Sequence, residues 1–312
     1  MTRRRALALL GSIASAAAAS ALLWPERPAG PTGAWLADAG LTARFDSIAG
    51  LRIRYVRAGT GPTVLLIHGL GSSIYTWKEI IPVLTRDHDV VALDLPGFGR
   101  SDQPPDLSIA VYPATILGLL DRLGIARASL VGHSLGGAVA TIVAARHPAG
   151  VDRLVLLDAA GFSLGPSDRP WLLRLLASDV GRVLTRLPRR RFFVTLGLRQ
   201  VFYDDRKVTA DRVDEYLAPV ERPGATEALR SLLSGLGAGA FMPFEDAAKQ
   251  VRAPTLVVWG QEDEWIPAHD ADRFVTAIPG ARKVLLGACG HMPQEELPAQ
   301  VSRLLSEFLT LS

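Results

Sequence analysis

The segment that most constrains the fold of this chain is Gly132–Gly136, which reads Gly-His-Ser-Leu-Gly. The apolar run Ala128–Val131 precedes it, and a small-residue pattern typical of a helix, Gly137–Ala145, follows it. A strand that turns sharply into a helix leaves no room for Cβ atoms beside the turn residue, so the flanking positions need glycine. The sequence therefore predicts a nucleophile elbow that presents the hydroxyl of Ser134. A chance match in a loop is the alternative.

A glycine-rich turn is expected upstream, where the apolar strand Thr63–Ile67 runs into His68–Ser73. Backbone N–H groups at such a turn can stabilise the negative charge that develops when a serine attacks a carbonyl. The N–H groups of Leu70 and Leu135 would then form an oxyanion hole. A tight turn without a catalytic role is the alternative, and His68 is expected to be structural.

A buried strand near the C-terminus, Pro254–Gly260, is followed by a carboxylate at Asp263. A carboxylate just beyond a strand end is placed to orient an imidazole, and the glutamates on either side of Asp263 are near rivals. Asp158 is a further alternative, because it follows the earlier apolar strand Leu154–Leu157. We therefore predict Asp263 as the acid and keep Asp158 open.

The last expected strand, Lys283–Leu286, leads to a loop that carries His291 between a glycine and a nearby proline. The residue types then follow one another along the chain as Ser134, Asp263 and His291. This serine, acid, histidine order is that of α/β-hydrolases and differs from the orders of chymotrypsin and subtilisin. The order predicts a catalytic triad in which His291 is the general base.

With these motifs, the chain resembles a member of the α/β-hydrolase superfamily, in the branch of esterases, lipases, C–C hydrolases and epoxide-hydrolase-like enzymes. The resemblance implies a mainly parallel twisted sheet flanked by helices, with a helical cap inserted above it. It also implies that Asp94 braces the sheet instead of reacting. The matching segments span nearly everything from about Leu41 to the C-terminus and are His68–Gly71, Asp94–Ser101, Gly132–Gly137, Gly260–Asp263 and Gly290–Pro293.

Four parts are expected along the chain. Residues 1–30 are read as a signal peptide or an N-terminal membrane anchor, and residues 31–160 as the first part of the α/β-hydrolase core. Residues 161–250, where the strand pattern stops and helical spacing takes over, would be the cap insertion, and residues 251–312 the second part of the core. The glycines, prolines and alanines of Gly30–Ala43 predict a linker, and an opening β-hairpin is expected to turn at Ala49-Gly50.

The cap is expected to shape the pocket and to exclude water from the strand ends, where ligands bind in open α/β sheets. Arg189–Arg191 is expected to form a solvated loop, with recognition of an acidic group or an anionic lipid as the alternative. The cap aromatic residues either line an apolar pocket or pack the cap onto the core; they are Phe192, Phe193, Phe202, Tyr203, Phe241 and Phe244.

At the N-terminus, the basic residues Arg3–Arg5 precede an uncharged, alanine-rich run, Ala6–Leu23. Basic residues before an apolar segment are typical of an export signal, and this one resembles a twin-arginine signal with Ala6 in place of the usual phenylalanine. The run is also long enough to remain as a membrane anchor. We expect an exported protein, periplasmic or extracellular, or one anchored through residues 6–23, in preference to a cytoplasmic one.

Composition excludes several classes of function. The net charge is only +3, 48% of the residues are hydrophobic, and the single cysteine, Cys289, can form no internal disulfide. No Cys/His metal spacing and no phosphate-binding glycine loop stand out. We therefore expect no cofactor, no metal and no nucleic-acid partner, and a small apolar ester or acyl compound as substrate. Membrane association through the N-terminal segment is possible, and the oligomeric state is not specified.

Together these features predict a serine hydrolase that cleaves carboxylic esters through an acyl-enzyme intermediate. A C–C bond hydrolase is an alternative, although Met292 replaces the tryptophan usual after the histidine in that group. An acyltransferase or perhydrolase on the same triad is another. A non-catalytic small-molecule binder on a hydrolase fold is the alternative from a different class.

Overall fold

The computed structural model describes residues 29–104, 107–162, 190–236 and 244–310. An eight-stranded sheet runs through them in the order β1-β2-β4-β3-β5-β6-β7-β8. Strand β2 is antiparallel to β1 and β4, and every other neighbouring pair is parallel, as the sequence predicts. The strands are β1 (Arg44–Ile48), β2 (Leu51–Ala58), β3 (Thr63–Ile67), β4 (Asp89–Leu93), β5 (Ala128–His133), β6 (Val151–Leu157), β7 (Thr255–Gly260) and β8 (Arg282–Leu286).

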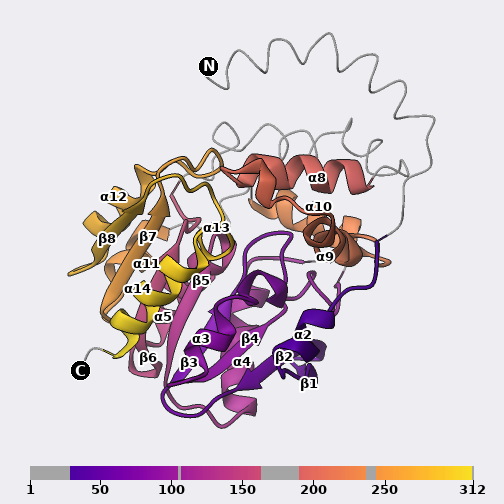
Figure 1. Cartoon of the computed structure of the whole chain (residues 1–312). Coiled ribbons are helices and arrows are strands. Elements are labelled where there is room, and N and C mark those ends of the chain that lie inside the picture. Colours follow the sequence, from indigo (N-terminus) through magenta and orange to yellow (C-terminus); the bar gives the residue numbers. More distant parts are fainter. Residues whose placement is uncertain (1–28, 105–106, 163–189, 237–243, 311–312) are drawn as a thin grey trace.

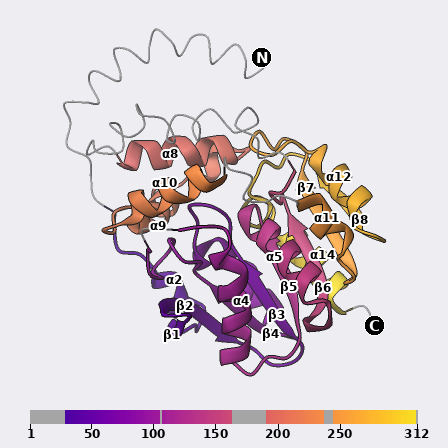
Figure 2. The same cartoon turned by 180° about the vertical axis from the view of Figure 1, so that it is seen from behind.

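Helices cover both faces of the sheet (Figures 1 and 2). One face carries α2 (Ala34–Asp38), α3 (Ile81–Leu84) and α14 (Pro298–Thr310), and the other carries α4 (Val111–Arg122), α5 (Leu135–Arg146), α11 (Phe244–Lys249) and α12 (Asp270–Ala277). The shorter elements are η1 (Ile74–Trp77), η2 (Pro148–Gly150), η3 (Asp205–Lys207) and α13 (Pro293–Glu296).

Alternation along the strands divides the core into two layers. In β3, Leu65 and Ile67 join the layer under α4 and α5, whereas Val64 and Leu66 join the layer under α3 and α14. A strand buried on both faces reads as a continuous apolar run, which is why β3 shows no polar alternation in the sequence. Both faces of the expected parallel sheet are therefore filled by side chains and covered by helices.

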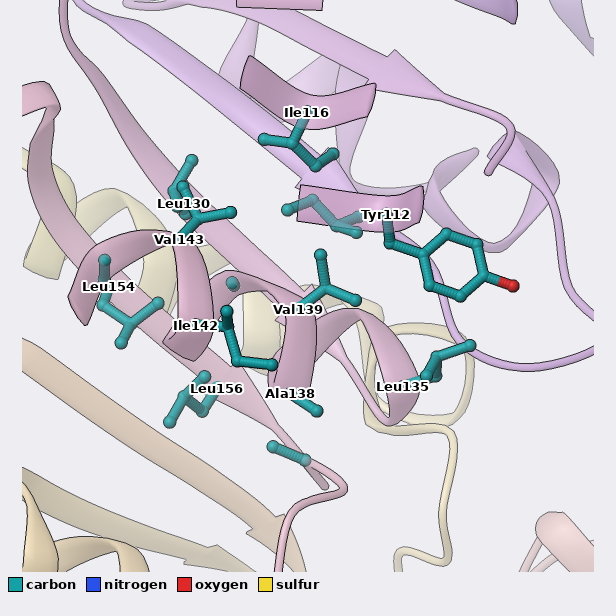
Figure 3. Close-up of a cluster of buried hydrophobic side chains, with 14 of the residues drawn as sticks. Tyr112, Ile116, Leu130, Leu135, Ala138, Val139, Ile142, Val143, Leu154 and Leu156 are labelled. Carbon is teal, nitrogen blue, oxygen red and sulfur yellow. The ribbon is translucent and has the colours of Figure 1, made fainter. Parts of the chain in front are cut away.

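Helix α5 packs against β5, β6, α4 and α11, and Figure 3 shows Leu135, Val139 and Val143 of this helix within the buried cluster. Every residue from Leu135 to Ala145 is buried. Small side chains permit this close approach: a Cβ added to Gly137 would lie 2.4 Å from the Cβ of Ala159. The helix that follows the predicted elbow is thus held by packing along its whole length.

The prediction of a linker over Gly30–Ala43 is wrong for Ala34–Asp38, because these residues form the one-turn helix α2. Leu36 of this helix and Leu41 after it are buried in the layer under α3 and α14. Apolar contact with the sheet therefore overrides the local glycine and alanine content. The predicted hairpin turn is confirmed, with Ala49 and Gly50 both at positive φ, 50° and 81°.

Between β6 and β7 the chain leaves the sheet, and the described residues there include three helices above the carboxyl ends of the strands: α8 (Arg190–Val201), α9 (Ala210–Val220) and α10 (Ala225–Leu236) (Figures 1 and 2). We refer to α8–α10 as the cap. Helix α11, which ends the range predicted for the cap, packs on α5 instead, and Phe244 lies in the core.

Some predictions fall outside the described residues: the whole N-terminal export or anchor segment, Arg189 and Phe241. Within the described residues, no helix combines the length and the apolar character needed to cross a membrane. The predicted solvated loop at Arg189–Arg191 is wrong for Arg190 and Arg191, since these two residues begin α8.

Candidate active site

The turn between β5 and α5 has the geometry of the predicted elbow. Ser134 has φ 51° and ψ −119°, a strained conformation for a residue with a Cβ, and its N–H donates to Leu157 O at 3.0 Å. A Cβ added to Gly132 would lie 2.4 Å from Gly136 O, and one added to Gly136 would lie 2.2 Å from Ile67 O. The glycines flanking the serine are therefore required by contact with backbone atoms.

Three side chains from three separate strand ends meet at this turn. The Nε2 atom of His291 lies 3.0 Å from Ser134 Oγ, and its Nδ1 atom lies 2.7 Å from Asp263 Oδ2. A carboxylate accepts only, so Nδ1 carries the proton and Nε2 is left to accept the serine O–H. The structure thus brings Ser134, His291 and Asp263 into one hydrogen-bonded chain.

The carboxylate of Asp263 is fixed on both oxygens. Oδ1 accepts the backbone N–H groups of Trp265 at 2.7 Å and Ile266 at 3.0 Å, which leaves Oδ2 for the imidazole. A carboxylate oxygen can accept several hydrogen bonds at once, so these contacts fix the orientation of the group. The loop after β7 therefore presents a fixed carboxylate to the histidine.

The alternative acid, Asp158, lies beside this pair but bonds differently. It is fully buried, and its Oδ1 accepts Gly260 N–H at 2.9 Å, while Oδ2 has no hydrogen-bond partner. Burial, and after it the negative charge of Asp263, raise the pKa of Asp158 well above its usual 3.8. His291 Nδ1 bonds to Asp263 and not to Asp158, so the geometry favours Asp263 as the acid.

The two predicted oxyanion donors are available. Leu70 follows β3 and Leu135 is the first residue of α5, and neither N–H donates a hydrogen bond to any group in the described parts of the chain. The first N–H groups of a helix have no intrahelical acceptor, and the helix dipole favours negative charge there. The turn after β3 is packed against the elbow, since a Cβ on Gly69 would lie 2.9 Å from Ser134 Cβ.

Two buried residues brace this turn from below. His68 accepts Leu95 N–H at Nε2 (2.9 Å) and contacts its neighbour's carbonyl through Nδ1, and burial lowers its pKa. Asp94 accepts the N–H groups of Ile74 at 2.7 Å and Arg100 at 2.8 Å, and its fully buried carboxylate pairs with Arg54 at 3.1 Å. Both residues thus have the structural contacts expected of them.

The loop that carries His291 is tied to the cap. The N–H of His291 donates to Val201 O, at the end of α8, over 2.8 Å. Glu296 Oε1 accepts Gly290 N–H at 2.8 Å, and Oε2 accepts Tyr203 N–H at 2.8 Å. One carboxylate therefore joins the histidine loop to the segment that follows α8.

Sequence reasoning assigned no role to several residues of the site. The Trp265 ring stacks on the His291 imidazole with centroids 5.7 Å apart, and His133 donates from Nε2 to His291 O at 2.7 Å. Burial lowers the pKa of His133 well below its usual 6.5, which keeps it neutral. Trp265 could have been noticed two residues after the predicted acid, but nothing in the sequence marks Glu296 among the acidic residues of α13.

A cavity of about 220 Å³ opens above Ser134 and His291. Its walls are mostly apolar, and the cap contributes Phe193 from the predicted aromatic set. Phe202 and Phe244 are instead buried in packing clusters, and Phe192 and Tyr203 are exposed. Arg190 lines the same cavity and also donates to Val220 O.

Among the described residues, one group could in principle hold a metal ion: Asp158, Asp263 and His291, whose ligand atoms lie within 4.8 Å of one another. A metal at this position would have to replace the hydrogen bond between His291 Nδ1 and Asp263 Oδ2. The donor set is already used as an acid and imidazole pair, so we assign it no metal.

Comparison with known proteins identifies the fold. Residues 62–298 match the family model of the alpha/beta hydrolase fold. A 2-hydroxymuconate semialdehyde hydrolase of Pseudomonas sp. (strain CF600) is 31% identical over 279 residues, covering 84% of this chain and 91% of that protein.

Two solved structures are similar over most of the chain. A meta-cleavage product hydrolase from Pseudomonas fluorescens IP01 has a TM-score of 0.74 and 28% identity, over 85% of this chain and 97% of that one. A membrane phospholipase A, described as a bacterial virulence factor, has a TM-score of 0.74 and 29% identity, over 99% of this chain and 98% of that one. The similar proteins therefore share a fold while their names give different substrates.

Proposed function

This chain belongs to the alpha/beta hydrolase fold family, and from that premise and the geometry of its site we propose that it is a serine hydrolase of carboxylic esters. The observation that carries the proposal is the hydrogen-bonded chain Ser134–His291–Asp263 at the floor of an apolar cavity. A serine hydroxyl is a weak nucleophile unless a base accepts its proton, and this arrangement supplies the base and its orienting acid.

In the proposed reaction, Ser134 Oγ attacks the ester carbonyl as its proton passes to His291 Nε2. The carbonyl oxygen becomes an oxyanion, which the N–H groups of Leu70 and Leu135 stabilise, each donor contributing about 3 kcal/mol in comparable sites. His291 then protonates the leaving alcohol, and the acyl group remains on Ser134. A water molecule, deprotonated by His291, attacks the acyl-enzyme and releases the acid.

The cavity supports an apolar acyl or aryl group as the part of the substrate that is recognised. Leu70 and Met292 from the core and Phe193 from the cap lie around the nucleophile. Burial of apolar surface is worth about 25 cal/mol per Å², so this lining would favour apolar acyl chains over charged ones.

The second candidate is hydrolysis of a C–C bond in a meta-cleavage product. The similarity to a 2-hydroxymuconate semialdehyde hydrolase and to a meta-cleavage product hydrolase favours it. Met292 argues against C–C hydrolysis, because that group usually carries tryptophan at this position. Trp265, from another loop, nevertheless stacks on the histidine. Acyl transfer to an acceptor other than water uses the same triad and remains a third candidate.

The cellular location that we propose is outside the cytoplasm. The support is the sequence of Arg3–Arg5 and the apolar run Ala6–Leu23, which is typical of an export signal or an anchor. Cell fractionation of the full-length protein, compared with a form that lacks residues 1–30, tests this directly.

The deciding experiment measures hydrolysis of p-nitrophenyl esters from acetate to palmitate, and of 2-hydroxymuconate semialdehyde, by the wild-type protein and by Ser134→Ala. We expect ester turnover that Ser134→Ala lowers by about 10⁴-fold or more, with unchanged circular dichroism. Turnover of the semialdehyde alone would replace the ester proposal by the C–C one. A folded wild-type protein that turns over neither and forms no adduct with a fluorophosphonate would be a binder.

A further inference from the structure

A second cavity, of about 400 Å³, lies apart from the nucleophile. It shares Pro219 of α9 with the cavity above Ser134, but none of Ser134, His291 and Asp263 lines it. Its walls come from β1 and β2, from Ser73, from the loop after β4, from Thr32 near the start of the described chain, and from the second half of α9 with Arg222 after it. It therefore lies where the edge of the cap meets the antiparallel end of the sheet (Figure 1).

Four arginines line this second cavity: Arg52, Arg54, Arg100 and Arg222. Arg54 is buried, Arg222 is half-buried, and Arg52 and Arg100 are exposed. The arginines that line this cavity therefore range from buried to exposed. One acidic side chain, Glu215, lines it with them.

The positive charges of these four arginines are only partly balanced by nearby carboxylates. Arg54 pairs with Asp94 at 3.1 Å, but within the described residues no carboxylate oxygen lies within 4.0 Å of the guanidinium groups of Arg52, Arg100 or Arg222. Burial lowers the pKa of Arg222; the negative charges of Asp94 and Asp102 act in the opposite direction, and the positive charges of Arg100 and Arg52 act in the same direction as burial. Four guanidinium groups around one cavity repel one another where nearby carboxylates balance them only in part, and a bound anion would lower that cost.

The acidic groups nearby are engaged by the backbone. Asp102 Oδ2 accepts Arg52 N–H at 2.8 Å, and Glu215 Oε1 accepts Gly33 N–H at 2.6 Å. Glu215 is the one carboxyl group among the described residues that lines the cavity; burial raises its pKa, while the Gly33 N–H and the positive charges of Arg100 and Arg54 act in the opposite direction. These carboxylates accept backbone N–H groups and do not form ion pairs with Arg52, Arg100 or Arg222.

The arginines are also held in position before any ligand binds. Arg222 donates to the carbonyls of Gly99 at 2.6 Å and Ser101 at 2.9 Å. Arg100 donates to Thr32 Oγ1 at 3.2 Å, and the Arg52 guanidinium stacks 3.6 Å above the ring of Phe45. Side chains fixed in this way lose less conformational entropy when a ligand binds.

We propose that this cavity is a binding site for a phosphate group, formed by Arg52, Arg100 and Arg222 above the Arg54–Asp94 pair. A phosphate offers several acceptor oxygens and up to two negative charges, and it can bridge several guanidinium forks, each of which matches two of its oxygens. The shared chemistry is a phosphomonoester or phosphodiester. It is supplied either by an anionic lipid headgroup or by a soluble phosphate ester.

The first test is calorimetric titration of the full-length protein with inorganic phosphate at pH 7 and constant ionic strength. We expect saturable binding that Arg52→Gln/Arg100→Gln weakens at least about tenfold, because two exposed charges of the site are removed. The matched control, Arg86→Gln/Arg303→Gln, removes two exposed arginines elsewhere and should bind like the wild type. Ser134→Ala should also bind phosphate normally, so the result does not depend on the proposed hydrolase activity.

The source of the phosphate is tested with glycerol 3-phosphate and with phosphatidylcholine vesicles that contain or lack phosphatidic acid. Retention on the acidic vesicles that Arg52→Gln/Arg100→Gln reduces and the control pair does not reduce supports a lipid headgroup. Saturable binding of glycerol 3-phosphate without such retention supports a soluble ester. No phosphate binding by the wild type up to about 20 mM, or equal binding by the two double variants, overturns the proposal.

Discussion

The floor of the site, meaning the turn around Ser134 and helix α5 that follows it, is held in place by different interactions from those that hold the cap. At the floor, glycines bring backbones into contact around Ser134, and α5 is buried from Leu135 to Ala145. At the junction of cap and core, a buried carboxylate of α13, Glu295, accepts Thr76 Oγ1 at 2.7 Å and Arg212 Nε of α9 at 2.8 Å, and also the Tyr216 hydroxyl. The floor therefore depends mainly on close backbone contacts, whereas the junction adds a buried charged network to the apolar contacts of the cap with Met292.

The difference predicts that mutations in the two regions will act in different ways. Apolar and glycine contacts tolerate little change in volume, whereas a buried ion pair tolerates volume changes but depends on both partners and on pH. Substitutions at the floor should mainly affect folding or the chemical step, and substitutions at the junction should mainly affect the pocket.

The largest effect is expected for Asp263→Asn, which keeps the shape of the floor but removes its one fixed anion. Asparagine would favour the wrong tautomer of His291, so kcat should fall by about 10⁴-fold while the unfolding temperature changes little. Kinetics on a p-nitrophenyl ester check this. Asp158→Asn is the control and should lose less than about tenfold, because Asp158 makes no hydrogen bond to His291 and burial raises its pKa toward the neutral form. The opposite ranking would make Asp158 the acid.

Next in size is Gly136→Ala, which tests the claim that shape holds the floor. Its Cβ would lie 2.2 Å from Ile67 O, so a backbone segment must move, at a cost of about 3 kcal/mol. Gly150→Ala is a matched control, since its Cβ would meet nothing closer than Ala126 O at 3.6 Å. Denaturant unfolding measures both, and equal stability of the two variants would contradict the contact argument.

A smaller effect is expected at the junction, for Glu295→Gln. The amide keeps the volume but loses the negative charge that faces Arg212, at a cost of about 2 kcal/mol. Because Tyr216 also lines the cavity, KM for long-chain esters should rise more than kcat falls. An equal loss for acetate and palmitate esters would show that the cap does not act through the pocket.

The smallest effect concerns pH and again uses Asp158→Asn. Burial raises the pKa of Asp158 in the folded protein, so the stability that its proton contributes is complete below about pH 4 and is lost as pH rises through the raised pKa. Asparagine has no such loss. The wild type should therefore lose at least about 1 kcal/mol relative to the variant between pH 4 and pH 8, measured by urea unfolding. A constant difference would mean that Asp158 is ionised in the folded protein.

The sequence predicted the floor better than the cap for a physical reason. Local features specify an elbow: the glycines around Ser134, the apolar strands and the order of serine, acid and histidine are all visible in the chain. The cap joins the core through contacts such as Arg212 with Glu295, which lie far apart in sequence and have no local signature. The same holds for the second cavity, whose arginines become neighbours only through the pairing of β2 with β4 and the position of α9.

The hydrogen bond from His291 N–H to Val201 O has a consequence for how substrate reaches the nucleophile. The general base and the end of α8 share one backbone contact, which Glu296 reinforces through Gly290 and Tyr203. If this corner of the cap lifted away, the imidazole would lose its support and the site would be switched off. Any movement of the cap that admits substrate must therefore leave this corner in contact with the core if the general base is to keep its position.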